Sequence, residues 1–375
     1  MKIIAISGSE IPSINANSIQ TMKAVHALAM VGHDVRLIVP FGSQQHHQST
    51  WKDLAHIYGL SREFEIEYLP SPSRRLFFFA ASRRAKKLKP DLLYVWPVQS
   101  AVLGLFMNLP VVLEMHDLPS GRIGPLWFRY FRDGKGKKRI AAITQALRNK
   151  LADIYGEPNT EMDCVIAPNG VELERFASLP DVTTARFQTG LAEAPTVMCT
   201  GHLYAGRGVE TFLFLAEQFR GQGIQFVWAG GNQADVEVWR EKAAGLPNVI
   251  FTGFIPNHEL PLYQAAADIL LMPYGKQIGI SSGKGNSAVI SSPMKMFEYL
   301  ASGRAIISSN LPVFHEVLGN TTAIFCPPDD LTAWKDAVQT LLDDPQKRQA
   351  MSASARQESI KYSWTERAKR ILEGF

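Results

Sequence analysis

The chain lacks the features that mark disulfide-rich and membrane-spanning proteins. Its 375 residues include only three cysteines, Cys164, Cys199 and Cys326, an odd number at wide spacing. We expect them to be buried free thiols in a reducing compartment. The longest apolar runs, residues 76–81 and 101–107, are far shorter than the roughly 18 residues that a spanning helix requires. Residues 1–7 have neither the basic region nor the long apolar core of a signal peptide, so we expect a cytoplasmic protein.

Common catalytic signatures are also missing. The histidines form no H-E-x-x-H pattern and the cysteines no C-x-x-C, and no Walker A or G-x-S-x-G sequence occurs. The loop after the first apolar run has one glycine, Gly8, instead of the three in G-x-G-x-x-G. This counts against a nicotinamide or flavin enzyme, and we expect neither a metal nor a cofactor.

Charge of one sign is concentrated in one segment. The formal net charge is only +4, yet residues 74–150 contain 16 Lys and Arg against four Asp and Glu. This local excess attracts acidic partners, which include an anionic membrane, a phosphorylated substrate and nucleic acid. No nucleic-acid-binding module accompanies the charge, so we expect no nucleic-acid partner.

Short apolar runs alternate with helical stretches in both halves of the chain. We expect strands at residues 2–6, 35–39, 92–96, 111–114, 139–143 and 164–167, and again at 196–200, 224–229, 249–252, 269–272, 305–308 and 323–326. Right-handed βαβ crossovers imply parallel sheets. The fold class is therefore α/β, with two doubly wound Rossmann-like domains facing across a cleft. We place them at residues 1–180 and 181–362, with a last helix at 363–375 returning to the first domain.

Polar residues follow the expected strands of the first half. Gly8 lies after residues 2–6, the usual place for phosphate or substrate contact in such a domain, although a tight turn alone also explains a glycine there. His116 and Asp117 follow residues 111–114 and can orient a sugar hydroxyl or share a proton. A histidine bound to a nearby carbonyl is the plainer alternative.

A loop in the second half combines glycines with a cation. Gly201, Gly206 and Gly208 surround Arg207 just before an expected helix. Glycines allow the backbone close to a ligand, and a guanidinium matches phosphate oxygens. The alternative is an arginine on a surface loop.

The segment around residue 295 combines a helix start with two charged side chains. Ser292 fits an N-cap and Pro293 the first helical position, which leaves free N–H groups beside Lys295. Glu298 can accept hydrogen bonds from two adjacent hydroxyls, as in a ribose. An amphipathic helix with a solvated Glu298 is the alternative.

Taken in order, these segments resemble the retaining, nucleotide-sugar-dependent glycosyltransferases of family 4 (glycosyl transferases group 1), which have the GT-B fold. The resemblance includes Glu-Met-His-Asp at 114–117 and Ser-Pro-Met-Lys-Met-Phe-Glu at 292–298. The matching segments are residues 32–40, 89–93, 114–117, 143–145, 165–176, 201–208, 292–304 and 362–367.

The resemblance implies a hexosyl transfer from a UDP- or GDP-sugar to a glycan or lipid-linked acceptor, with retention and without a metal. It implies a role for Arg207 at the donor diphosphate, for Glu298 at the donor ribose and for His116 near the donor sugar. The further implied donor contacts are Gly8, His202, Gly230, Gly231, Ile255, Ser292, Met294 and Lys295.

Two positions depart from the family pattern. The first glutamate of the E-x7-E motif would fall at Ile290, and His202 stands where many members have an arginine. Two alternatives therefore stay open. One is a nucleotide-sugar epimerase on the same fold, and the other is a non-catalytic nucleotide-sugar-binding protein.

Basic and aromatic residues lie together in the half that the resemblance assigns to the acceptor. Arg83, Arg84, Lys86 and Lys87 follow a cluster of phenylalanines. Such a surface suits a protein bound to an anionic bilayer, so we expect peripheral association with the inner face of the membrane. An amphipathic helix with a solvated basic face is the alternative.

Overall fold

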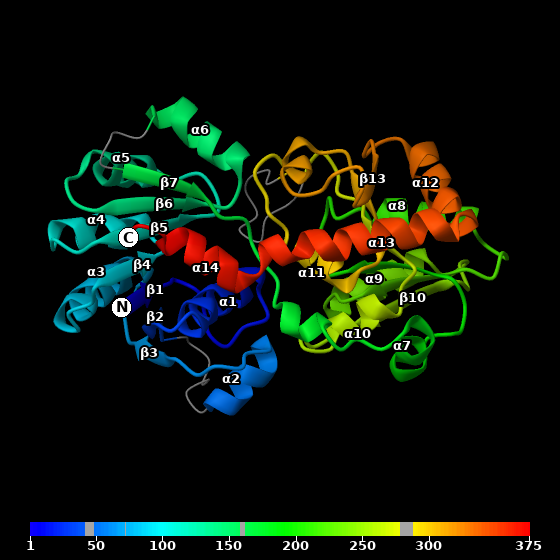
Figure 1. Cartoon of the computed structure of the whole chain (residues 1–375), viewed down its shortest axis with the longest axis horizontal. Helices are drawn as coiled ribbons and strands as arrows, with labels where there is room; N and C mark the ends of the chain where they lie inside the picture. Colours follow the sequence, from blue (N-terminus) through cyan, green and yellow to red (C-terminus); the bar gives the residue numbers. More distant parts are fainter. Residues whose placement is uncertain (42–48, 72, 158–161, 278–287) are drawn as a thin grey trace. The chain divides into compact units, whose positions relative to one another are not determined.

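The computed structural model describes residues 1–41, 49–71, 73–157, 162–277 and 288–375, which form two compact units. The first unit is Met1–Asn169 with Trp364–Phe375, and the second is Gly170–Ser363. Each unit is a parallel sheet flanked by helices (Figure 1).

Within the described residues, the sheet of the first unit has seven parallel strands in the order β3-β2-β1-β4-β5-β6-β7. The inner strands are buried on both faces, which is why their sequences are continuous apolar runs. The strands are β1 (Lys2–Ile6), β2 (Asp34–Pro40), β3 (Glu65–Leu69), β4 (Leu92–Val95), β5 (Val111–Met115), β6 (Lys138–Ala142) and β7 (Met162–Ile166).

The sheet of the second unit has six parallel strands among the described residues, in the order β10-β9-β8-β11-β12-β13. Its core is built on Phe212, Trp228 and Trp334, which are fully buried. The strands are β8 (Thr196–Thr200), β9 (Gln225–Ala229), β10 (Val249–Gly253), β11 (Ile269–Met272), β12 (Ala305–Ser309) and β13 (Ala323–Cys326).

Helices connect the strands of both sheets. The first unit contains α1 (Ala16–Met30), α2 (Trp51–Tyr58), α3 (Arg74–Lys87), α4 (Val98–Phe106), α5 (Gly124–Asp133), α6 (Gln145–Tyr155) and α14 (Trp364–Leu372). The second contains α7 (Val182–Thr189), α8 (Val209–Gln218), α9 (Gln233–Lys242), α10 (Leu260–Ala265), α11 (Met294–Ser302), α12 (Leu331–Asp343), α13 (Pro345–Ser359) and the short 3₁₀ turns η1 (Leu173–Phe176), η2 (Pro312–Glu316) and η3 (Ile360–Tyr362).

The twelve expected strands all occur, with ends displaced by at most two residues. One strand, β3, was not expected, because the prediction was based on short apolar runs, whereas β3 alternates glutamates with apolar residues at the edge of the described sheet. Ion pairs hold it there: Arg36 of β2 binds Glu65 and Glu67, and Arg84 of α3 donates to Glu67 at 2.6 Å. Such partners are distant in sequence and leave no local pattern.

The division between the units falls at Asn169 and Gly170, earlier than the expected boundary at residue 180. The intervening segment packs within the second unit. Val171 N–H donates to the carbonyl of Tyr362, Phe176 is buried, and Arg356 donates to the Phe176 carbonyl at 2.9 Å. The residues just after the expected boundary form α7, which begins at an Asp181 N-cap.

Helix α14 belongs to the first unit, where it packs against α1. Its Arg367 forms a two-pronged ion pair with Glu114 of β5, with Nη2–Oε1 and Nη1–Oε2 distances of 2.7 and 3.2 Å. Both side chains are buried, with exposed fractions of 4% and 0%. Burial alone would raise the pKa of Glu114, but the charge of Arg367 and the hydrogen bond with His116 hold it well below the ordinary value.

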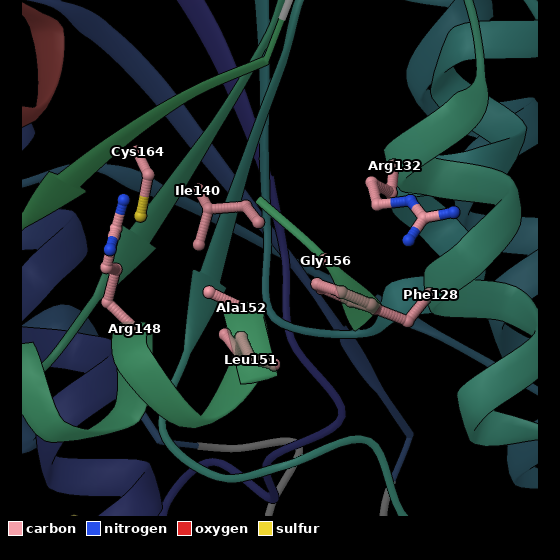
Figure 2. Close-up of a pocket in the computed structure, with 8 residues that line it drawn as sticks. All are labelled: Phe128, Arg132, Ile140, Arg148, Leu151, Ala152, Gly156 and Cys164. Atoms are coloured by element: carbon pink, nitrogen blue, oxygen red, sulfur yellow. The ribbon is translucent and has the colours of Figure 1, made fainter. Parts of the chain in front are cut away.

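A small cavity lies beside β6 and β7 (Figure 2). Its volume of about 10 Å³ is room for about one water molecule. Cys164 lines it and is half-buried, whereas Cys199 and Cys326 are buried as expected. Burial raises the pKa of the Cys164 thiol to about 11, so this cysteine is protonated at neutral pH.

No helix in the described ranges is long and apolar enough to cross a membrane.

We predict that Gly208→Ala destabilises the second unit by on the order of 3 kcal/mol. Gly208 has φ +80°, and an added Cβ would lie 1.8 Å from the carbonyl oxygen of Pro273, which is backbone and cannot rotate away. Gly221 is the matched control, because its φ is +79° and an added Cβ would meet nothing within 4 Å. Gly221→Ala should cost only about 1–2 kcal/mol. Urea unfolding followed by tryptophan fluorescence measures both, and equal losses would contradict the prediction.

We also predict that Glu114 makes the stability of the first unit depend on acid pH. The unfolded carboxyl titrates near its ordinary value of 4.5, and the folded one titrates well below it. Between these values the unfolded chain binds a proton that the folded chain does not, so stability falls as pH falls. Unfolding measured at a series of pH values from about 5 to 3 should therefore show a shallower slope for Glu114→Gln than for the native protein. Equal slopes would show that the ion pair does not control acid stability.

Candidate functional site

In each sheet the strand order reverses between two adjacent strands. These are β1 and β4 in the first unit, and β8 and β11 in the second. Ligands of doubly wound sheets bind at the carboxyl ends of the strands beside this reversal. The predicted site residues should therefore gather at these two places.

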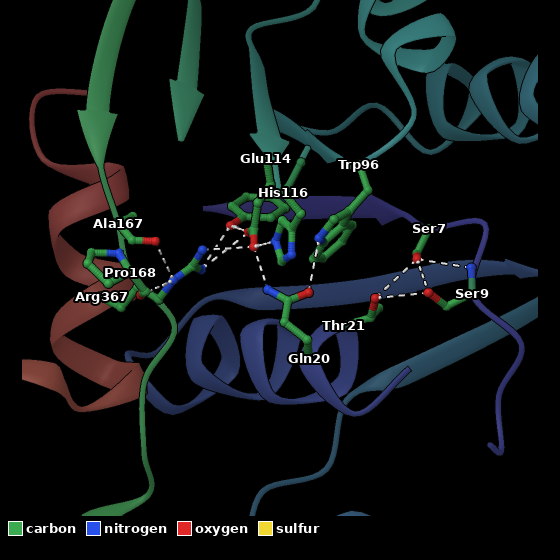
Figure 3. Close-up of polar contacts among 11 residues, drawn as sticks. Ser7, Ser9, Gln20, Thr21, Trp96, Glu114, His116, Ala167, Pro168 and Arg367 are labelled. Carbon is green, nitrogen blue, oxygen red and sulfur yellow. Dashed lines mark hydrogen bonds and ion pairs between the residues drawn. The ribbon is translucent and has the colours of Figure 1, made fainter. Parts of the chain in front are cut away.

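The first unit has a pocket of about 520 Å³ at its reversal point. Gly8 lies in its wall between Ser7 and Ser9, whose hydroxyls form a buried cluster with Thr21 at separations of 3.0–3.3 Å (Figure 3). The further lining residues are Asn17, Gln20, Phe78, Trp96, Pro97, Val98, Gln99, Glu114, Met115, His116, Asp117, Leu118, Pro119, Ser120 and Gly124. The lining is rich in hydroxyl, amide and carboxylate groups, which suits a ligand that carries hydroxyls.

His116 lies at the edge of this pocket, with its ring against the buried Glu114. Its Nε2 is 2.6 Å from Glu114 Oε1. Figure 3 shows Arg367 on one side of the carboxylate and His116 on the other. The partner of His116 is therefore a carboxylate and not the local carbonyl of the plainer alternative.

In the second unit, two cations converge on a buried tyrosine. Arg207 Nη1 donates to the Tyr274 hydroxyl at 2.6 Å, and both the Arg207 guanidinium carbon and Lys295 Nζ lie 5.0 Å from the centre of the Tyr274 ring. Burial alone would raise the pKa of Tyr274, but Arg207 and Lys295 lower it below the ordinary value of 10.0. The sequence analysis predicted both cations but not Tyr274. Its position just after β11 could have indicated that it lies near the ligand-binding end of the sheet.

His202 stands next to this group. Its ring stacks on Tyr204, with centroids 5.0 Å apart and planes at 10°. Burial, and then the positive charges of Arg207 and Lys295, lower the pKa of His202, so the imidazole is neutral at pH 7. Its buried Nδ1 makes no hydrogen bond to the described residues.

Glycines bring three backbone segments together around these side chains. A Cβ added to Gly230, which has φ +127°, would lie 2.7 Å from the Gly201 carbonyl oxygen, and one added to Gly231 would lie 2.7 Å from the Leu203 side chain. A Cβ on Gly201 would lie 3.7 Å from Lys295 Nζ. The predicted residues Gly230 and Gly231 therefore support the loop that carries His202 and Arg207.

Helix α11 begins one residue later than predicted. Its first residue is Met294, and the N-cap position is Pro293, whose ring cannot accept a hydrogen bond from the helix. Ser292, the predicted N-cap, is buried one residue earlier. Glu298 is half-buried and accepts a hydrogen bond from Gln264 Nε2 at 3.3 Å. Ile290 is buried, with 3% of its surface exposed, so an apolar side chain occupies the position of the missing glutamate.

The other predicted site residues have no described contact with the His116 pocket or with the cluster of Arg207, Tyr274 and Lys295. Ile255 is half-buried in the loop after β10, and no described contact joins it to Arg207 or Lys295. Arg83, Lys86 and Lys87 are exposed on α3, but Arg84 is bound to Glu67 and is not part of the free basic surface. The described ranges hold no group of three or more His, Cys, Asp or Glu residues arranged to bind a metal ion.

Sequence comparisons agree with this geometry. Residues 19–175 match the family described as Glycosyltransferase Family 4, and residues 194–344 match the one described as Glycosyl transferases group 1. The chain is 25% identical over 248 residues to the GDP-mannose-dependent alpha-(1-6)-phosphatidylinositol monomannoside mannosyltransferase of Mycolicibacterium smegmatis. This alignment covers 64% of this chain and 63% of that protein. It is 24% identical over 250 residues to the D-inositol 3-phosphate glycosyltransferase of Kineococcus radiotolerans, covering 63% and 56%. The matches thus span less than two thirds of the length of these curated relatives.

Solved structures share the fold over the whole chain. The Anabaena protein HepE in complex with UDP has a TM-score of 0.74 at 17% identity, with 100% of this chain and 99% of that chain covered. WaaG, a glycosyltransferase involved in lipopolysaccharide biosynthesis, has a TM-score of 0.67 at 16% identity, with coverage of 99% and 100%. The predicted fold class, two Rossmann-like α/β domains of the GT-B type, is confirmed. With one family domain matched in each unit, the chain belongs to the family 4 and group 1 glycosyltransferases.

Proposed function

We propose that this protein transfers a sugar from a nucleoside-diphosphate sugar to an acceptor hydroxyl. The convergence of Arg207 and Lys295 on buried Tyr274 is the observation that carries the proposal. Two cations held this close repel each other, and a bound anion relieves that repulsion. The group lies at the carboxyl ends of β8 and β11, where such a sheet binds its ligand.

The proposed reaction develops negative charge at the diphosphate. The bond from the sugar's anomeric carbon to the diphosphate oxygen breaks, while a bond from that carbon to the acceptor oxygen forms. Arg207, Lys295 and the N–H groups in the first turn of α11, which has no side-chain cap at Pro293, stabilise the leaving diphosphate. Because these groups supply the positive charge that a metal supplies elsewhere, we propose a metal-independent reaction.

We propose that the anomeric configuration is retained, as the family resemblance implies. The acceptor then attacks from the face that the diphosphate leaves, and a leaving phosphate oxygen takes the acceptor's proton. This route needs no nucleophile from the protein. Glu298 is assigned to the donor ribose, because its carboxylate is half-buried on the same helix as Lys295.

The donor is proposed to be a UDP- or GDP-hexose. The solved HepE structures contain UDP, UDP-glucose, or UDP with glucose, and the mycobacterial relatives are named as GDP-mannose-dependent enzymes. We assign the nucleoside to the surroundings of Gly230, Gly231 and Ile255, at the ends of β9 and β10.

The pocket of the first unit favours a transferase over an epimerase, since an epimerase needs no acceptor site. Its volume of about 520 Å³ suits a sugar-sized group. The hydroxyl cluster of Ser7, Ser9 and Thr21 provides partners for acceptor hydroxyls, and His116, which the resemblance assigns to the donor sugar, lines the same pocket. We propose that the acceptor is a glycan or a lipid-linked molecule.

Helix α3 supports the proposal of an anionic membrane partner. Leu76, Phe79, Arg83 and Lys86 follow one another at helical spacing and are all exposed, whereas Phe77 on the opposite face is fully buried. Aromatic residues of α5 extend the patch: Trp127 lies 6.5 Å from the Phe79 ring and 6.5 Å from the Tyr130 ring, and Leu126 is also exposed. An apolar stripe that continues into basic side chains is typical of binding to an anionic bilayer.

We predict that Arg207→Ala lowers kcat for sugar transfer by roughly 10²–10³-fold, because it removes a cation from the leaving diphosphate. The measurement is product formation from a panel of UDP- and GDP-hexoses with glycan and lipid-linked acceptors. Arg220→Ala is the matched control, since Arg220 is a half-exposed surface arginine of the same unit paired with Glu217. The control should keep native activity. Equal activity of Arg207→Ala and the native protein would contradict the proposed site.

The same panel separates the alternatives. An epimerase would convert the donor without any acceptor. A binding protein would bind a nucleotide sugar, measured by calorimetry, yet form no product with any acceptor.

We predict that the protein sediments with phosphatidylglycerol-containing vesicles at low salt but not with pure phosphatidylcholine vesicles. Replacing Arg83, Lys86 and Lys87 together by Gln should weaken this binding about 10²-fold, because each basic residue near an anionic surface contributes about 1 kcal/mol. Arg84 is left unchanged, since it stabilises β3 through Glu67.

A second triple variant controls for total charge. Lys242, Lys347 and Lys361 are exposed lysines of the second unit, and replacing them by Gln should leave vesicle binding unchanged. Loss of binding in both variants would indicate a non-specific charge effect and not a defined surface.

A further inference from the structure

The buried carboxylate of Glu114 accepts hydrogen bonds from several sides. Oε1 accepts from Gln20 Nε2 and Arg367 Nη2, and Oε2 accepts from the Tyr94 hydroxyl and Arg367 Nη1. The Gln20 amide cannot be reversed, because its Oε1 accepts from Trp96 Nε1 at 3.2 Å. Gln20, Tyr94 and Arg367 therefore each point a hydrogen toward the carboxylate.

Arg367 is held so firmly that its direction is fixed. Its Nε donates to the carbonyl oxygens of Ala167 and Pro168 at 3.2 and 2.9 Å, while the two Nη atoms bind Glu114 (Figure 3). A guanidinium has five N–H donors in a rigid plane. Because Nε binds the two carbonyls and the Nη atoms bind Glu114, the guanidinium cannot rotate without losing several of these hydrogen bonds.

The charge state of Glu114 settles which nitrogen of His116 carries hydrogen. Burial would favour the protonated acid, but Arg367, and then His116, lower the pKa of Glu114, so the group is ionised at neutral pH. An ionised carboxylate only accepts hydrogen bonds. Because His116 Nε2 lies 2.6 Å from Glu114 Oε1, the hydrogen must be on Nε2. In the neutral imidazole, Nδ1 then has a free lone pair.

We propose that Arg367 is a positioning residue for His116, acting through Glu114. It keeps the carboxylate an acceptor, which fixes the Nε2–H form of His116 and presents Nδ1 as a hydrogen-bond acceptor for a sugar hydroxyl in the pocket. The tautomer follows from the contacts of the first unit alone. Its consequence for turnover rests on the proposed glycosyl transfer.

The imidazole is well placed for this task. His116 lines the pocket together with the hydroxyl-bearing residues Ser7 and Ser9, and its side chain is 31% exposed. The ring edge that carries Nδ1 is turned away from the carboxylate. With Nδ1 protonated and Nε2 bare, the same ring would donate to a sugar hydroxyl and place a lone pair against the carboxylate, which is repulsive.

The test is the tautomer of His116 in the full-length protein without substrate. Long-range proton–nitrogen NMR correlation on ¹⁵N-histidine-labelled protein distinguishes the two tautomers, and His116→Gln identifies the signal. The native protein should show the Nε2–H form at a pH where the ring is neutral. A native Nδ1–H form would overturn the proposal, whatever the activity.

Two variants test the role of Arg367. Arg367→Gln leaves Glu114 buried without its counter-ion and is expected to be destabilised. The double variant Glu114→Gln with Arg367→Gln removes both charges while keeping the side chains polar and of similar reach. Because the amide introduced at position 114 can present either its oxygen or its NH₂ group to the ring, we expect a mixture of tautomers. A double variant that keeps the pure Nε2–H form would refute the role of the ion pair.

Kinetics add an independent readout. The double variant should lose roughly 10–100-fold in kcat with an unchanged KM for the donor, whereas Lys369→Gln, an exposed cation of the same helix, should behave as the native protein. A loss confined to donor KM would contradict the proposal. Absence of transfer in the native protein would refute the proposed function but leave the tautomer result standing.

Discussion

The ion pair between Glu114 and Arg367 is the contact on which the first unit depends. A buried carboxylate is costly unless a cation and further hydrogen bonds compensate it. Here the compensation comes from α14, from Gln20 of α1 and from Tyr94 of β4, so three elements meet at the end of β5. Removing the helix would therefore leave both an exposed core and an unpaired charge. Glu114 also contacts His116 in the pocket, so a change that breaks the ion pair affects both the stability of the unit and the hydrogen bond of His116.

The second unit handles charge in the opposite way. Arg207 and Lys295 converge on the hydroxyl-bearing ring of Tyr274, not on a carboxylate. A carboxylate would neutralise the two cations and compete with an incoming anion. A phenol accepts a hydrogen bond and offers a π-face, yet leaves both positive charges available. In the first unit the carboxylate of Glu114 neutralises the charge of Arg367. In the second unit the phenol of Tyr274 leaves the charges of Arg207 and Lys295 available to bind an anion.

The fold could be predicted from the sequence largely because parallel strands buried on both faces are local apolar runs. The runs that became β8 and β11 are examples, with matching ends. Strand β3 and helix α7 were missed, since Arg36, Arg84 and the surrounding second unit stabilise them from afar. Of the site, Gly8, His116 and Arg207 were predicted from positions after strands, and Lys295 was predicted from its place at a helix start. Glu114 and Arg367 were not linked, because 253 positions separate them and neither side chain alone signals the other.

The chain passes from the first unit to the second after Asn169 and comes back at Trp364. This return has a consequence for the order of events during synthesis. A ribosome completes the seven described strands of the first sheet, and then the second unit, before Arg367 emerges. Throughout that interval Glu114 has a place in the core but no counter-ion, and a nascent chain tends to fold its domains from the N-terminus. The first unit must therefore wait in an unfinished state while the second one folds, so the domain that is made first is the one that is completed last.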